Sequence, residues 1–182
     1  KNIIIPVIEV KQRVKNVITT SQVTRYKDWA AVNNPSGVVP APYDSYVWRG
    51  TGSSTFSDWD INASPSSSVW EFMTRTEKRD NACGAAIEVR SRGDYVSTTL
   101  LDYRKTKVLA QVANAVQSDI AFTSFEDNST GNFSLFDGGV LMGESKTGQQ
   151  SHKLGLAGIS KSGLSENISH TISFWAKSSG GT

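Results

Sequence analysis

The stretch GDYVSTTLLDYRKTKVLAQVANA, residues 93–115, carries the pattern that decides the fold. It begins with a glycine turn, continues through a run rich in Tyr and Leu, and then alternates through Val108, Ala110 and Val112. A period of two places every second side chain on the same face of an extended chain, which is typical of a β-strand. The stretch contains no catalytic motif, so its regularity points to architecture.

The composition of the chain agrees with a β-rich fold. Its 182 residues suit one domain or two small ones, and 37% hydrophobic residues with five Trp are enough for a core. Gly, Ser and Thr are abundant and aliphatic runs are short, a balance that favours strands and turns. The 19 basic and 17 acidic residues leave a formal charge of +2 and are not gathered into a patch, so we expect no nucleic-acid partner. No run approaches the roughly 20 apolar residues of a membrane span.

The first strands are expected at residues 3–26, where apolar and polar residues alternate on both sides of Lys15-Asn16. Asn tolerates a positive φ, so this pair suits a hairpin tip, and the two arms are expected to pair antiparallel. From residue 27 to residue 68 the pattern breaks into turn-forming Gly, Pro, Ser, Asn and Asp, which predicts loops with a mobile tip at SPSSS, residues 64–68. Disordered linkers are poor in aromatic residues, so these loops are expected to pack on a sheet through Trp29, Trp48, Phe56 and Trp59.

Strand patterns resume at residues 69–80 and 85–92, separated by a turn at residues 81–84 and followed by a second turn at Gly93-Asp94. Turns about 10 residues apart suit an antiparallel meander. A helix over residues 75–92 is the alternative, but the β-branched residues Thr74, Thr76, Ile87 and Val89 favour extended chain.

The order of these pieces resembles the tyrosine–aspartate (YD, or RHS-type) repeat region of very large secreted bacterial surface proteins, in the subset where the repeats run into an F-x-S-F-E segment. The resemblance covers most of residues 6–126. The matching pieces are Arg79-Asp80, Gly84, Gly93, Tyr95, Asp102-Tyr103, Val112, Asn114-Ala115 and Phe122 to Glu126. In this chain the usual Tyr-Asp order is reversed at Asp102-Tyr103, and one clear repeat copy is present. Since about three repeats are needed for an independent solenoid or shell, the resemblance implies contact with neighbouring repeats of a longer chain.

Residues 122–182 have a lower charge density, and strands are expected near residues 121–126, 151–156 and 170–176. The pattern SFED…TG…S-x-K-L…TISFWAK resembles the first half of galactose-binding-like, carbohydrate-binding jelly rolls. That resemblance implies a structural calcium ligand at Glu126, because the opening strand of the family often supplies one and calcium prefers oxygen ligands. An ordinary exposed carboxylate at a strand end is the alternative. Trp175 is the candidate sugar-contacting residue, against the alternative that it packs in a core.

No set of residues predicts catalysis. Asp58 and Asp60 offer the closest approach to the paired carboxylates of a glycosidase, but they lie in a Ser- and Gly-rich loop. His152 and His170 stand 18 residues apart without acidic or Cys partners at metal spacing, and the single cysteine, Cys83, lies in a turn-like context. We therefore expect that the chain is not an enzyme and that it binds no cofactor other than calcium at Glu126.

Together these patterns predict an all-β chain, with antiparallel repeat-type hairpins in residues 1–121 and the first strands of an incomplete β-sandwich in residues 122–182. The resemblance implies a non-catalytic stretch of a large exported bacterial cell-surface protein, a candidate type IX secretion substrate that provides scaffold and adhesion. The strand-like run at residues 171–177, close to the end of the sequence, suggests an internal piece of a longer chain. The expected partners are neighbouring repeats, secretion or outer-membrane proteins, and glycans. A dedicated glycan-binding module and a toxin-encapsulating shell are the alternative functions.

Overall fold

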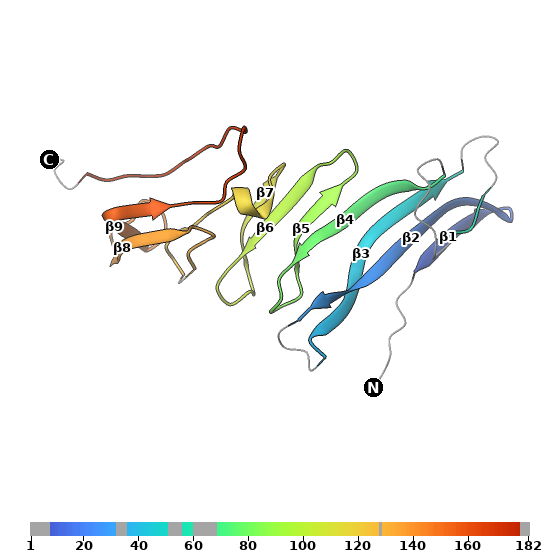
Figure 1. Cartoon of the computed structure of the whole chain (residues 1–182), viewed down its shortest axis with the longest axis horizontal. Helices are drawn as coiled ribbons and strands as arrows, with labels where there is room; N and C mark the ends of the chain where they lie inside the picture. Colours follow the sequence, from blue (N-terminus) through green and yellow to red (C-terminus); the bar gives the residue numbers. More distant parts are fainter. Residues whose placement is uncertain (1–7, 32–35, 51–55, 60–68, 128, 179–182) are drawn as a thin grey trace. The chain divides into compact units, whose positions relative to one another are not determined.

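The computed structural model describes residues 8–31, 36–50, 56–59, 69–127 and 129–178. It is all-β, as predicted. The strands are β1 (Glu9–Val14), β2 (Val17–Ala30), β3 (Val38–Arg49), β4 (Glu71–Arg79), β5 (Ala86–Ser91), β6 (Val96–Leu101), β7 (Val108–Ala113), β8 (Leu135–Met142) and β9 (Gln150–Ser160), with a short 3₁₀ helix, η1 (Gln117–Asp119) (Figure 1). β1 to β7 form an antiparallel sheet in sequence order, and β8 and β9 form a second, two-stranded sheet.

The chain divides into two compact units, Lys1–Thr98 and Thr99–Thr182, with the division inside β6. The boundary expected near residue 121 does not coincide with this division. Residue 121 lies after β7 and before β8, where the larger sheet has ended and the two-stranded sheet has not yet begun. Assignment of residues 1–121 to repeats and of residues 122–182 to a sandwich stays a prediction.

The first hairpin has the predicted tip and the predicted pairing. Lys15 and Asn16 both have positive φ, 47° and 64°, the backbone that a two-residue hairpin turn needs. β1 and β2 pair antiparallel from Glu9 opposite Val23 to Val14 opposite Val17. Residues 3–7 of the expected hairpin lie outside the described residues.

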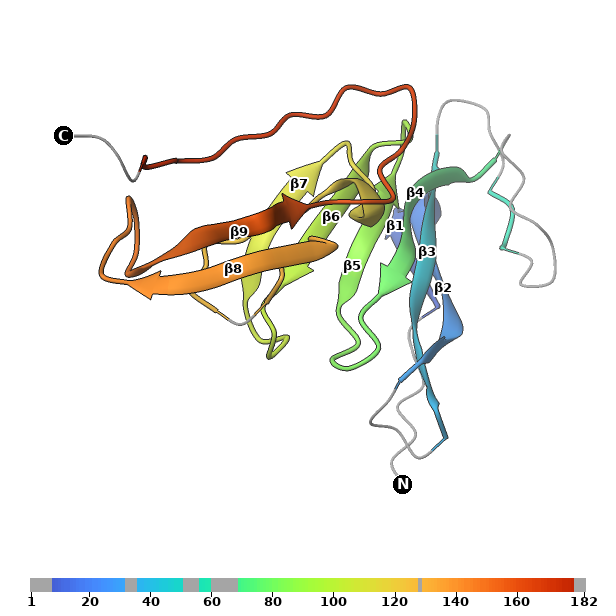
Figure 2. The same cartoon turned by 60° about the vertical axis from the view of Figure 1, so that its left-hand side comes forward.

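The expectation of loops after residue 27 is wrong for two segments. β2 continues to Ala30, and β3 pairs with it along its whole length (Figure 2). Pro40 and Pro42 suggested a loop because a proline has no N–H to donate to a ladder. The register of β3 with β4, however, covers only Asp44 to Val47, so both prolines lie beyond it and cost the sheet no bond on that side. The expected mobile tip at residues 64–68 lies outside the described residues.

An aromatic core covers one end of the β2–β3–β4 sheet. Its buried members are Val23, Tyr46, Trp48 and Trp70, and Ile18, Phe56, Trp59 and Phe72 pack against them. The Trp59 and Trp70 rings meet edge to face with centroids 5.1 Å apart, a favourable geometry for aromatic pairs. Phe56 and Trp59 belong to the stretch expected to fold back on a sheet, and their packing confirms that prediction.

The meander predicted for residues 69–113 is confirmed, and the helix alternative for residues 75–92 is wrong. Asp80 follows β4 and accepts backbone N–H bonds from Ala82 and Cys83 with one carboxylate oxygen, which closes the turn into β5. Gly93 and Asp94 both have positive φ, 80° and 63°, and form the next tight turn.

The turn between β6 and β7 is built around Asp102. Its carboxylate accepts hydrogen bonds from the Thr106 N–H at 2.7 Å, the Lys107 N–H at 3.1 Å and the Thr106 hydroxyl at 3.1 Å. Burial alone would raise the pKa of Asp102, but the hydrogen bonds from Lys107 and Thr106 outweigh it and hold the pKa below its usual value. This buried Asp joins the two strands of the segment that decides the fold.

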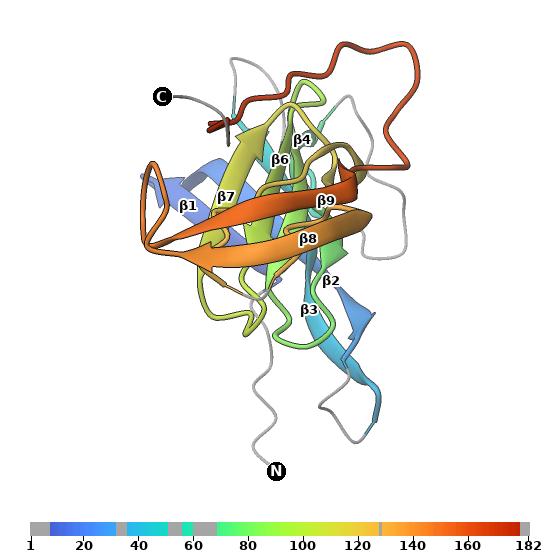
Figure 3. The same ribbon diagram turned by 90° about the vertical axis from the view of Figure 1, so that its left-hand side faces the viewer.

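Two of the three strands expected after residue 120 are absent. Residues 121–126 bend, with Phe125 at a φ of 64° and its N–H donated to the Thr123 hydroxyl. Residues 161–178 contain no strand. The strand expected at residues 151–156 exists as part of β9, and its partner β8 was not predicted because Gly138 and Gly139 interrupt its pattern (Figure 3). Alternation makes a strand only where another strand supplies hydrogen bonds.

Replacement of Trp48 by Ala should lower the free energy of unfolding by about 3–5 kcal/mol, because the indole is buried and its removal leaves a cavity. The matched control is Trp175→Ala, whose side chain is 77% exposed and whose loss should change stability by less than about 0.5 kcal/mol. Urea unfolding followed by circular dichroism measures both. Equal losses in the two variants would contradict the assignment of the core.

Replacement of Asp102 by Asn should lower the urea midpoint at about pH 7. The midpoint of the variant should also fall less than that of the wild type when the pH is lowered. A carboxyl whose pKa is lowered by folding adds stability above its unfolded pKa and loses it as the pH falls through the folded pKa. The gap between wild type and variant should therefore narrow at about pH 3 or below. A gap that stays constant between the two pH values would show that the Asp102 carboxylate does not stabilise the turn.

Candidate functional site

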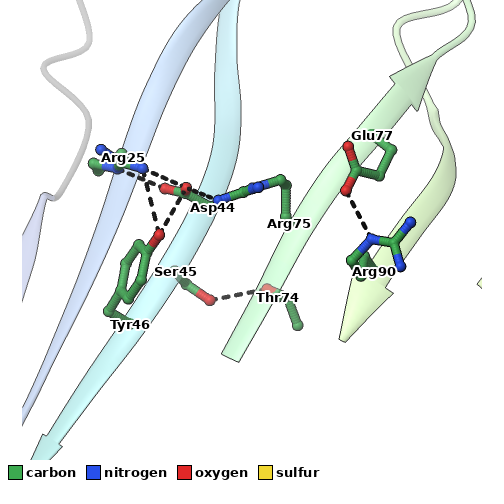
Figure 4. A network of polar contacts seen from close by, with 8 residues as sticks. All are labelled: Arg25, Asp44, Ser45, Tyr46, Thr74, Arg75, Glu77 and Arg90. Carbon is green, nitrogen blue, oxygen red and sulfur yellow. Dashed lines mark hydrogen bonds and ion pairs between the residues drawn. The ribbon is translucent and has the colours of Figure 1, made fainter. Parts of the chain in front are cut away.

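A row of charged side chains crosses four strands of the larger sheet. Arg25 on β2 lies opposite Asp44 on β3, Asp44 lies opposite Arg75 on β4, and Arg75 lies opposite Arg90 on β5. Residues directly opposite in antiparallel strands share a face of the sheet. The row in Figure 4 therefore belongs to one face.

Asp44 is the centre of the row, and its side chain is 0% exposed. The guanidinium of Arg25 donates to both carboxylate oxygens, at 2.7 Å and 2.6 Å, and the Tyr46 hydroxyl donates at 3.2 Å. A guanidinium nitrogen of Arg75 lies 3.5 Å from the same carboxylate. The hydrogen bond to Asp44 raises the pKa of Arg25. Forked arginine bonding of this kind is strong and geometrically specific.

A β-bulge beside Asp44 places two consecutive side chains on this face. Arg25 pairs with Asp44 and Tyr26 pairs with Pro42, so Tyr43 is an extra residue in β3. The Arg75 guanidinium lies 5.4 Å from the Tyr43 ring centre and also pairs with Asp44, so both residues face it. An unbulged strand would send Tyr43 to the opposite face.

Beyond the bulge the same face carries cations stacked on aromatic rings. Lys27 Nζ lies 4.2 Å from the Trp29 ring centre and 4.5 Å from that of Tyr43. The guanidinium of Arg79 lies 5.5 Å from the Trp29 ring and donates to the carbonyls of Gly84 and Pro42. Burial lowers the pKa of Arg79. We call Lys27, Trp29, Tyr43, Arg75 and Arg79 the cationic face.

The neighbouring polar contacts tie β4 to its neighbours. Arg90 donates to Glu77 at 3.0 Å, and its guanidinium lies 3.6 Å from the exposed Asp94. The Ser45 and Thr74 hydroxyls pair at 2.9 Å; their positions next to Asp44 and Arg75 assign them to the opposite face (Figure 4). Arg90 therefore has acidic partners, whereas the cations beyond the bulge have aromatic ones.

Glu126, the predicted calcium ligand, is exposed and accepts backbone N–H bonds from Gln149 and Gln150 at 2.9 Å and 2.8 Å. Both bonds end on the same carboxylate oxygen, so the surroundings offer donors rather than the oxygen ligands that calcium takes. In the described ranges, no three His, Cys, Asp or Glu side chains gather as a metal site. Calcium at Glu126 stays a prediction, and the contacts seen give this residue a capping role.

Trp175, the predicted sugar-contacting residue, is exposed and lies outside any strand. Lys146 Nζ lies 5.2 Å from the centre of its ring, and Lys177 Nζ lies 3.4 Å from a carboxylate oxygen of Glu144. Glu126 and Trp175 thus both contact the segment that links β8 and β9. A sugar-binding role of Trp175 stays a prediction.

The remaining candidates are scattered. Asp58 pairs with Lys11, and Asp60 lies outside the described residues. His152 stacks on Phe125 with ring centres 5.4 Å apart, His170 contacts the Ser165 carbonyl, and Cys83 is exposed. Sequence reasoning missed the cationic face, although Arg25, Lys27 and Trp29 stand two residues apart, the spacing of one strand face.

Comparison of this chain with protein-family models, with curated proteins and with solved structures gives no match. In the part of the chain that is described, no helix combines the length and the apolar character needed to cross a bilayer.

Replacement of Asp44 by Asn should destabilise the chain by about 3 kcal/mol, because the two guanidinium groups beside it lose their counter-charge at a buried position. Asp94→Asn is the matched control, since it removes the same charge from a side chain that is 89% exposed. Chemical denaturation measures both. Similar small effects in the two variants would show that the row of charged side chains contributes little to stability.

Proposed function

We propose that this chain is a non-catalytic scaffold segment of a large exported bacterial cell-surface protein, whose exposed apolar surfaces pack against neighbouring segments of the same protein. The resemblance to YD-type repeats suggests the class, and export through the type IX pathway is part of the proposal. The observation that carries it is the uncovered apolar surface of the second unit.

That surface is concentrated on β8, β9 and the segment after them. The exposed apolar residues are Val140, Leu141, Met142, Leu154, Leu156, Leu164, Ile168, Ile172, Phe174 and Trp175. A two-stranded sheet on its own is marginally stable in water, and a concentration of exposed apolar side chains marks an interaction site. The sheet of β1 to β5 has a buried aromatic core and ion pairs between its strands, which suits a scaffold.

Residues 168–177 provide the test. In the isolated chain of 182 residues their backbone amides should exchange with deuterium within seconds, because none of the described strands pairs with them. In the intact protein extracted from the bacterial surface, the same amides should be at least about a hundredfold better protected. Hydrogen exchange read by mass spectrometry compares the two states. Equal exchange in both, or absence of the intact protein from the surface fraction, would contradict the scaffold function.

Binding of a glycan is the second candidate function, and the exposed ring of Trp175 with Lys146 beside it favours it. A glycan array probed with the chain, with and without a calcium chelator, tests this candidate. Sugar-specific binding that is lost in Trp175→Ala would favour it over a purely structural role.

A further inference from the structure

We propose that the cationic face of β2 to β4 binds an anionic polysaccharide whose sugar rings carry carboxylates. This proposal uses residues of the first unit only and does not depend on the scaffold function or on Trp175. The proposal rests on the positive charges around Asp44 that this single carboxylate does not neutralise.

The sheet shows how this face holds a carboxylate. Asp44 receives the fork of Arg25 and a contact from Arg75, so one carboxylate neutralises one guanidinium and shares a second. Lys27 forms no ion pair in the described ranges, and its ammonium lies over the rings of Trp29 and Tyr43. The terminal nitrogens of Arg79 donate hydrogen bonds to backbone carbonyls. A carbonyl accepts a hydrogen bond but does not neutralise the charge of the guanidinium.

Positive charges therefore outnumber negative ones on the solvent-accessible part of the cationic face. Lys27 is exposed, and the side chain of Arg75 is 35% exposed. Arg25, Lys27, Arg75 and Arg79 bring four positive charges against the one negative charge of Asp44. The partly desolvated guanidinium of Arg75 pairs more strongly with a ligand anion than a fully hydrated cation would. An anion placed between Lys27 and Arg75 would gain from both.

The aromatic residues argue for a sugar polymer. Trp29 and Tyr43 are half-buried, and their ring centres lie 6.2 Å apart at 58°, beside the cations. A uronic acid presents a carboxylate for the ammonium or guanidinium and apolar C–H groups for the part of each aromatic ring that stays exposed beside the cations. Nucleic acid is the weaker fit, because its binding depends on neutralising many phosphates and the whole chain has a formal charge of only +2.

Affinity electrophoresis of the complete chain tests the proposal with polygalacturonate as the ligand. Dextran serves as the neutral control, dextran sulfate as the sulfated one, and double-stranded DNA as the nucleic acid. We expect polygalacturonate to bind more tightly than dextran sulfate or DNA, and dextran not to bind. Lys27→Gln should weaken polygalacturonate binding about tenfold, the effect of one lost charge-assisted contact. Lys27→Arg, which keeps the charge, should retain binding.

The matched control is Lys153→Gln, which removes the same charge from an exposed position on β9. It should change the affinity by less than about twofold. Near-ultraviolet circular dichroism confirms that each variant is folded; should Lys27→Gln not fold, Trp29→Phe replaces it and should weaken binding by reducing the ring surface. Equal losses in Lys27→Gln and Lys153→Gln, stronger binding of DNA or dextran sulfate, or no polygalacturonate binding at all would overturn the proposal.

Discussion

The buried carboxylate of Asp44 is the constraint on which the larger sheet depends. A carboxylate removed from water is stable only when cations and hydrogen-bond donors replace the lost hydration. Arg25, Arg75 and Tyr46 supply them from three strands, so β2, β3 and β4 are held in one register. A shift of one residue between any two of these strands would turn Asp44 or its partners to the opposite face.

The same position divides one face of the sheet into two regions. On one side of the row, Tyr46 and Trp48 enter the aromatic core with Trp70. On the other side, the bulge at Tyr43 turns an additional ring towards the cations of β2 and β4. A stable core and an accessible charged surface thus occupy consecutive parts of the same strands.

Four turns of the larger sheet follow a common chemical rule. Asn16 and Asp94 adopt positive φ at tight tips, while Asp80 and Asp102 accept the backbone N–H groups of the residues that follow them. Short polar side chains do both at low cost. Local chemistry at these four turns therefore returns the chain beside the strand it has just left.

The sequence by itself determined the all-β class, the first hairpin and the meander from residue 69 to residue 113, because alternation and turn residues act over a few positions. Tertiary structure decided what depends on distant partners. β3 became a strand despite Pro40 and Pro42 because β2 supplied its hydrogen bonds, and residues 170–176 stayed unpaired despite a strand-like pattern because no strand lies beside them in the described ranges. The cationic face likewise depends on the register and the bulge. Lys27 and Arg79 are 52 positions apart in the sequence (79 − 27), and the sheet brings both of their charged groups to the ring of Trp29.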